Sequence, residues 1–184
     1  MRSPPSVFFD GENQVDDYCV PHRHLKAGRT TEMAVIELAE ISKSFKPASR
    51  LMALDLGSKT IGLALSDVTL MIASPLKTIK RAKFTRDAET LEALIDEHDV
   101  GGLVLGLPIN MDGSEGPRCQ STRQFATNLL ERRDIRLAFW DERLSTVAVE
   151  RILIDEVDMT RKRRAEVVDK AAAAYILQGA LDSL

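Results

Sequence analysis

Residues 50–67, RLMALDLGSKTIGLALSD, contain two apolar runs on either side of a short Gly-Ser-Lys turn. The second run alternates large aliphatic residues with small ones, which is typical of a strand with one buried face. The stretch therefore predicts a pair of antiparallel strands over 50–56 and 60–67. One carboxylate, Asp55, interrupts the first run, and it needs an explanation because burying an unpaired charge is costly.

The rest of the chain alternates between short apolar runs and amphipathic stretches, which predicts strands alternating with helices. After the first two strands, a third strand is predicted at 74–80, followed by a helix that is capped by Thr85 and ends near Asp99. A strand at 101–108 and a helix capped by Ser114 come next. The chain then continues with a strand at 135–143, a helix capped by Ser145 and a last helix at 165–181. This order predicts an α/β fold with a mixed sheet and helices packed on its faces.

Composition sets limits on the kind of protein. At 184 residues, with 44% hydrophobic and 29% charged residues, the chain is long enough for one ordinary core. Its net charge of -3 excludes a global attraction to nucleic acid, so any such binding must use a local basic patch. Cys19 and Cys119 match no zinc spacing, which favours a reducing, cytoplasmic location. No apolar run reaches the roughly 18 residues that a membrane span needs, and no signal peptide is recognisable.

The N-terminal part, residues 1–48, shows neither sustained alternation nor a helical stripe. We interpret it as a poorly ordered extension before a domain at 49–184. Met33 begins a helix-compatible stretch and is a candidate translational start, which a peptide upstream of Met33 in the native protein would disprove. The histidines in HRH, residues 22–24, have no partner ligands nearby and are interpreted as part of a polar tail.

Acidic residues occur at three places where a ligand site would form. Asp55 ends the first strand, and Asp141 and Glu142 end a later one, at the sheet edge where α/β ligand sites gather. Asp169 lies on the apolar stripe of the last helix. Structural roles remain open at this point, because Asp55 can accept amides of the following turn and Asp141 and Glu142 can favour a helix start.

If these acids converge, their mutual repulsion requires a compensating cation. Ligation by oxygen alone is typical of Mg²⁺ or Mn²⁺, and such sites activate water for phosphodiester cleavage. A nuclease also needs contacts to phosphate. The candidate cations for that role are Lys59, Arg143, the run Arg161, Lys162, Arg163 and Arg164, and a second run formed by Lys77, Lys80, Arg81, Lys83 and Arg86. A solvated charged face is the alternative interpretation of both runs.

Four stretches occur in an order that resembles one family: LDLGSKTIGLALSD, VLGLPINMDGSEG, DERLST and VDKAAAAYILQGAL. They resemble the YqgF/RuvX family, nucleases for the small-subunit ribosomal RNA precursor that are also described as Holliday-junction-resolvase-like. The resemblance covers about residues 51–181 and implies an RNase H-like fold with metal-dependent cleavage of nucleic acid. It implies that the catalytic acids are Asp55, Glu142 with its neighbour Asp141, and Asp169. It also implies that the loop containing Asn110 forms one wall of the cleft.

The sequence therefore predicts a metal-dependent hydrolase acting on phosphodiester bonds, most directly in processing of the 16S ribosomal RNA precursor. Two alternatives remain: a Holliday junction resolvase, and a non-catalytic nucleic-acid-binding factor in ribosome assembly or transcription. The first turn also resembles that of actin/hexokinase phosphotransferases, but the structured part is too short for their two lobes. The expected partner is a structured RNA precursor or a DNA junction, bound by a monomer or a homodimer, away from any membrane.

Overall fold

A computed structural model of the chain describes residues 35–44, 46–144 and 161–184, and gives only the backbone of residues 44, 144 and 161–170. Its centre is a five-stranded sheet in the order β3-β2-β1-β4-β5. The strands are β1 Arg50–Leu56, β2 Thr60–Ser66, β3 Ala73–Lys80, β4 Val100–Leu107 and β5 Arg136–Asp141. β2 pairs antiparallel with both of its neighbours, whereas β1, β4 and β5 are parallel. This arrangement is the predicted RNase H-like mixed sheet.

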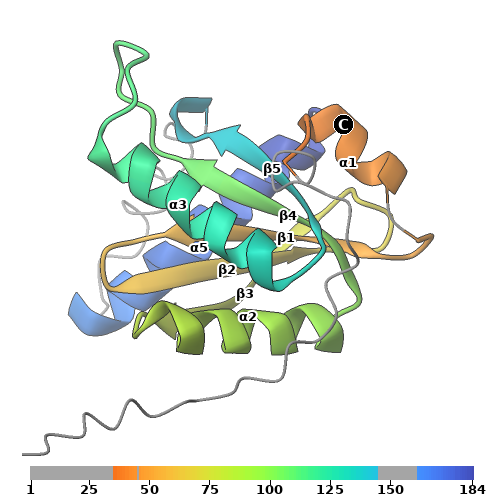
Figure 1. The fold of residues 1–184 in the computed structure, drawn as a ribbon, viewed down its shortest axis with the longest axis horizontal. Coiled ribbons are helices and arrows are strands. Elements are labelled where there is room, and N and C mark those ends of the chain that lie inside the picture. The colour runs from red at the N-terminus through yellow and green to blue at the C-terminus, as the bar shows by residue number, and fades with distance from the viewer. Residues whose placement is uncertain (1–34, 45, 145–160) are drawn as a thin grey trace, which may run out of the picture.

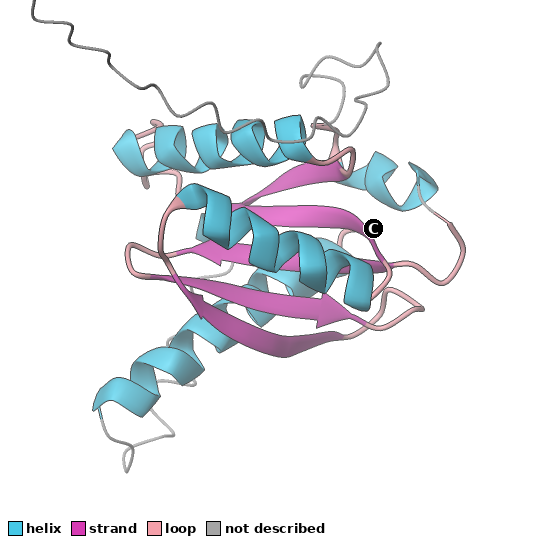
Figure 2. Ribbon diagram, turned by 60° about the horizontal axis from the view of Figure 1, so that its bottom comes forward, coloured by secondary structure: helices cyan, strands magenta, loops and turns pink. Residues whose placement is uncertain are grey.

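Helices cover both faces of the sheet (Figures 1 and 2). Helices α2, Phe84–Glu97, and α3, Pro117–Arg132, pack on one face. Helix α5, Arg161–Leu181, crosses the other face, behind the sheet in Figure 1. Among the described helices, none has the length and apolar composition that crossing a bilayer requires.

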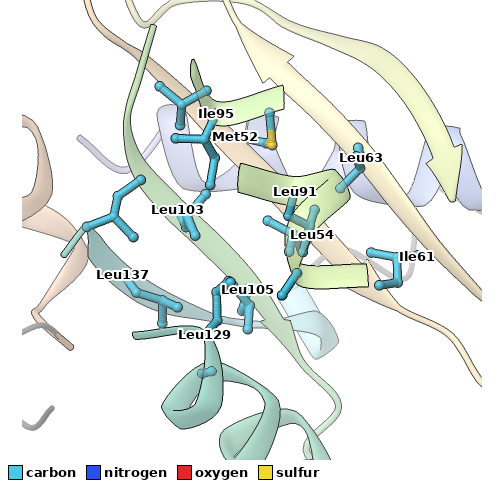
Figure 3. Packing of buried hydrophobic residues seen from close by; sticks show 14 of the residues in the cluster. Met52, Leu54, Ile61, Leu63, Leu91, Ile95, Leu103, Leu105, Leu129 and Leu137 are labelled. Carbon is cyan, nitrogen blue, oxygen red and sulfur yellow. The ribbon is translucent and has the colours of Figure 1, made fainter. Parts of the chain in front are cut away.

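Strand alternation divides the core into two layers. Met52 and Leu54 of β1 point to the layer under α2 and α3, which Figure 3 shows from close by. Leu51 and Ala53 point to the layer under α5, where Ala173 is among the small residues of the helix that contact the sheet. Asp55 continues the alternation of Leu51 and Ala53, so β1 presents it on the α5 face.

The segment before β1 belongs to the fold from Val35 onward. Val35 forms a parallel bridge with Leu137 of β5, and the Ile36 N–H donates to the Leu137 carbonyl at 2.9 Å. Ile41, in the short helix α1, Leu38–Ile41, is fully buried. The domain therefore extends further toward the N-terminus than the expected boundary at 49, because this segment covers the free edge of β5. The candidate start at Met33 and the HRH histidines lie outside the described residues.

The predicted helix caps are wrong at two places. Helix α2 begins at Phe84, one residue before Thr85, and the buried Asp87 accepts the Ala82 N–H at 3.0 Å. Helix α3 begins at Pro117 rather than after Ser114, since proline is well suited to the first helical position and Ser114 is hydrogen-bonded within the preceding loop. The helix predicted after Ser145 lies outside the described residues.

Candidate active site

Four of the five strands run in one direction, so their carboxyl ends lie at one edge of the sheet. We call this the carboxyl edge. Asp55 of β1, the loop after Leu107 of β4 and the last residue of β5, Asp141, all lie there. In Figure 1 the edge is on the left, where α5 also begins. The fold thus brings together the ends of β1 and β5, where the candidate acids Asp55, Asp141 and Glu142 were predicted to lie.

The pairing register brings Asp55 next to a glycine. Leu54 pairs with Leu105, so the next residues along these parallel strands, Asp55 and Gly106, lie side by side. A Cβ atom on Gly106 would lie 2.6 Å from Oε1 of Glu142 and 2.7 Å from Cδ1 of Ile176 in α5. The space over Gly106 is therefore filled by the Glu142 carboxylate, which lies under α5 and beside Asp55.

Electrostatics show that the two acids interact. Burial, followed by the negative charges of Asp55 and Asp141, raises the pKa of Glu142 to about 7, although the positive charge of Arg118 opposes the rise. Glu142 is half-buried, so the site is neither dry nor fully solvated. A carboxyl group whose ionisation is disfavoured by a neighbouring carboxylate is typical of a cation site to which no cation is bound.

The donor set fits a hard divalent cation. Mg²⁺ is commonly bound by one or two carboxylates, with water and substrate phosphate as its other ligands. Asp55 and Glu142 supply two such oxygen donors on one face of the sheet. Among the described side chains, which do not include those of residues 145–170, no three His, Cys, Asp or Glu groups lie close enough together to hold a metal ion.

The adjacent acids Asp141 and Glu142 have different partners. Asp141 lies in β5 and forms an ion pair with Arg143, at 2.6 Å between Oδ2 and Nη2. The Arg143 backbone N–H donates to the other carboxylate oxygen of Asp141, Oδ1, at 3.0 Å. Hydrogen bonding from the Arg143 side chain lowers the pKa of Asp141. Glu142 starts the following turn, η3 Glu142–Leu144, and is the acid that lies over Gly106.

A cleft of about 410 Å³ opens beside Glu142, between the loop 108–116 and the start of α3. Asn110 and Arg143 line it, and their contacts to substrate stay predictions. The Asn110 side chain also holds the loop, donating from Nδ2 to Oγ of Ser114 at 2.9 Å. Ser114 in turn donates to Asp112, and Sγ of Cys119 lies 2.8 Å from the Pro108 carbonyl oxygen. We call this the loop cleft, and its own hydrogen bonds fix its wall.

Arg118 is a site residue that the sequence analysis missed. It is the second residue of α3, it is exposed, and it lines the loop cleft together with Glu142. Its charge acts on Glu142, which places a cation next to the candidate metal ligand. A signal was present in the sequence, because an Arg directly after a Gly-Pro helix start follows the loop that was already assigned to the cleft.

The remaining candidates lie around the same edge. Lys59 is exposed in the turn that follows β1, and its carbonyl accepts the Arg81 N–H at 2.9 Å. Arg161, Lys162, Arg163 and Arg164 form the first turn of α5. Asp169 lies in α5, seven residues or about two turns before Ile176. The side chains of Asp169 and of residues 161–164 lie outside the described part, so their roles stay predictions.

A mixed sheet with paired acids at its carboxyl edge, next to a cleft lined by arginines, defines the class of the protein as an RNase H-like fold with a candidate nuclease site. Comparison with known proteins agrees with this class. A protein of Paramagnetospirillum magneticum named "Putative pre-16S rRNA nuclease" is 64% identical over 151 residues, which is 82% of this chain and 97% of that protein. A protein of Rhodospirillum rubrum with the same name is 60% identical over 83% of this chain and 94% of that protein.

The family model of RuvX, described as Holliday junction resolvase, matches residues 49–183. The chain belongs to the RuvX family. Among solved structures, Thermus thermophilus RuvC in complex with a Holliday junction substrate is similar at a TM-score of 0.48 and 11% identity, over 73% of this chain and 94% of that chain. The family assignment is made on the sequence matches.

Proposed function

We propose that this chain is a divalent-metal-dependent nuclease that hydrolyses phosphodiester bonds in the 16S ribosomal RNA precursor. The relatives named as pre-16S rRNA nucleases and the family match support the substrate class. The observation that carries the proposal is the approach of Asp55 and Glu142 over Gly106, at the carboxyl edge and next to the loop cleft.

In this proposal Asp55 and Glu142 hold Mg²⁺ or Mn²⁺, and Asp169 completes the ligand set from α5. When bound, such an ion polarises a phosphoryl oxygen and lowers the pKa of an attacking water. The close fit over Gly106 orients the Glu142 carboxylate. The Asp141–Arg143 pair holds the Arg143 guanidinium at the loop cleft, where it and Arg118 neutralise substrate phosphate. Lys59 and the basic first turn of α5 add further phosphate contacts.

The description of the family model favours a second candidate substrate, a four-way DNA junction. The same acids would serve either substrate, because metal-assisted hydrolysis acts on the phosphodiester group that RNA and DNA share. A two-fold junction would favour a symmetric dimer. The substrate therefore has to be decided by direct comparison.

The test is a Mg²⁺- or Mn²⁺-dependent cleavage assay on three substrates: a 16S precursor fragment, generic single-stranded RNA and a DNA four-way junction. We expect cleavage of the precursor fragment that EDTA stops and that Asp55→Asn reduces at least 100-fold, because this change keeps the shape of the side chain and removes its charge. Asp99→Asn is the matched control. Asp99 lies at the opposite edge of the sheet, far from the candidate acids. Its backbone has a positive φ of 53°, a conformation that Asn tolerates.

Equal cleavage by the parent and Asp55→Asn proteins would disprove the assignment of Asp55. Cleavage of the junction alone would replace the RNA substrate with DNA. Binding of RNA without any metal-dependent cleavage would favour a non-catalytic factor.

A further inference from the structure

A second cleft lies at the opposite side of β1 from the loop cleft, at the corner between β3 and α2. Its volume is about 410 Å³. Four cations line it: Lys77, Lys80, Arg81 and Arg86. We call it the β3–α2 pocket. It shares no lining residue with the loop cleft.

The pocket is electropositive because four cations line it against one acid, Asp87. Asp87 is 2% exposed, and its Oδ1 accepts the Ala82 N–H at 3.0 Å. Within the described part of the chain, the ion pairs are made by other cations, such as Arg132 with Glu92 and Arg133 with Asp96. Four like charges around one cavity, in a chain of net charge -3, attract an anion.

The pocket is attached to the turn that follows Asp55. Arg81 donates from Nη1 to the Gly57 carbonyl at 3.0 Å, and its backbone N–H donates to the Lys59 carbonyl at 2.9 Å. These bonds fix the end of β3 against the β1–β2 turn. The Arg81 guanidinium carries five N–H donors, so donors remain for a ligand after the Gly57 contact.

The sheet register gives the spacing between the pocket and the candidate active site. Asp55 pairs with Gly62, and Gly62 pairs with Thr78, which lines the pocket. Two strand spacings are about 10 Å. A bound nucleic-acid strand, which carries one phosphate per nucleotide, can therefore reach from one place to the other within a few nucleotides. The β3–α2 pocket and the loop cleft thus lie on either side of β1 along the carboxyl edge, with α2 bordering the pocket on one sheet face and Asp55 on the face that α5 covers.

We propose that the β3–α2 pocket binds backbone phosphates of the nucleic-acid strand, within a few nucleotides of the bond that is cleaved. The inference rests on the proposed nuclease function and adds the place and the kind of contact. Among the described residues, those that line the pocket include no aromatic side chain on which a base could stack. Cations from a strand and a helix contact phosphates without reading the sequence.

The test uses the full chain in EDTA, with fluorescein-labelled 20-nucleotide single-stranded RNA and a labelled four-way DNA junction as probes in anisotropy titrations. The test variant is Lys77→Ala/Arg86→Ala, since both side chains are exposed. We expect about tenfold weaker binding at 0.1 M salt. For the RNA, the slope of log K against log salt becomes shallower by about 1.4, at about 0.7 for each lost phosphate contact.

Two controls separate a local contact from general charge. Lys43→Ala/Lys46→Ala removes the same charge from exposed positions before β1, at the opposite edge, and binding should change less than twofold. Lys77→Arg/Arg86→Lys keeps both charges and should bind like the parent. An unchanged affinity and salt slope in Lys77→Ala/Arg86→Ala, or an equal loss in the Lys43→Ala/Lys46→Ala control, would overturn the inference.

The result is independent of the test of catalysis. If Asp55→Asn abolishes cleavage while the pocket variant binds normally, the pocket inference fails and the nuclease proposal stands. If the parent cleaves nothing while the pocket variant loses binding, the pocket stands as part of a nucleic-acid-binding surface and the nuclease proposal fails.

Discussion

Glu142 is the residue whose chemistry is most changed by the fold. Without a cation, burial and the neighbouring acids raise its pKa to about 7 from 4.5. Between these two values the folded protein binds more protons than the unfolded chain, so the free energy of unfolding falls as pH rises through that range. The contribution of Glu142 to the free energy of unfolding is fully present below pH 4.5 and is lost above about pH 7.

We therefore expect the metal-free protein to become less stable between pH 5 and pH 7.5. One pKa unit corresponds to about 1.4 kcal/mol, and partial exposure of Glu142 reduces the total to about 2 kcal/mol. Glu142→Gln should remove most of this pH dependence and raise the melting temperature at pH 8 by several degrees. Thermal unfolding in EDTA at a series of pH values measures both effects.

Glu131→Gln, on the exposed surface of α3, is the control and should keep the slope of the parent. A Glu142→Gln protein with the parental pH dependence would show that another group is responsible.

The sequence identified the residue types at the site better than their individual roles. It placed Asp55 at a strand end because a lone acid in an apolar run is conspicuous. It did not decide whether Asp141 or Glu142 is the metal ligand, because adjacent acids differ only in their contacts. Asp141 pairs with Arg143, whereas Glu142 lies over Gly106. Arg118 was missed because its proximity to Glu142 is a tertiary contact, although its place directly after the loop assigned to the cleft was visible in the sequence.

At the scale of elements, the site depends on how closely α5 approaches β4. Gly106 permits that approach, since a Cβ there would lie within 2.7 Å of both Glu142 and Ile176. Further along the helix, Gly179 plays the same part against Trp140, with a Cβ placed 2.9 Å from its Cζ2. Both glycines allow α5 to pack closely on the sheet, but only the contact at Gly106 involves a candidate metal ligand, Glu142.

Gly106→Ala should therefore displace the Glu142 carboxylate and lower cleavage at least tenfold, with a loss of about 1–3 kcal/mol in unfolding free energy from overpacking. Gly179→Ala is the matched control, because it introduces a similar steric clash on the same helix but at a place distant from the acids. It should retain most activity. Urea unfolding and initial cleavage rates measure the two effects. Equal activity losses in the two variants would assign the effect to helix displacement alone.

Strand positions were predictable because alternation and glycine-bounded apolar runs record burial directly, and β1 occupies its predicted range of residues 50–56. Helix starts were less predictable, because Thr85 and Ser114 are good caps in isolation but the chain uses Asp87 and Pro117. The packed segment around Ile41 was missed for a similar reason, since its burial comes from contact with Gly102 and the sheet rather than from a long periodic stripe.

At the scale of the whole molecule, the parallel strands collect the candidate chemistry along one edge. The loop cleft, the acids and the β3–α2 pocket follow one another from β5 to β3. The alternation of strands and helices predicted this mixed sheet, and the ordered motifs indicated the family that the comparison shows. The two clefts were not predictable, because each is formed by elements that are distant in the sequence.

The central claim is that Asp55, Glu142 and Asp169 hold one divalent-cation site. It is tested most directly by titrating the metal-free full-length chain with Mn²⁺ and following free Mn²⁺ by electron paramagnetic resonance. We predict saturable binding that Asp55→Asn, Glu142→Gln and Asp169→Asn each weaken at least tenfold, whereas Asp141→Asn, which removes the partner of Arg143, changes it less than threefold. Unchanged binding in Asp55→Asn or Asp169→Asn, or an equal loss in Asp141→Asn, would contradict the claim.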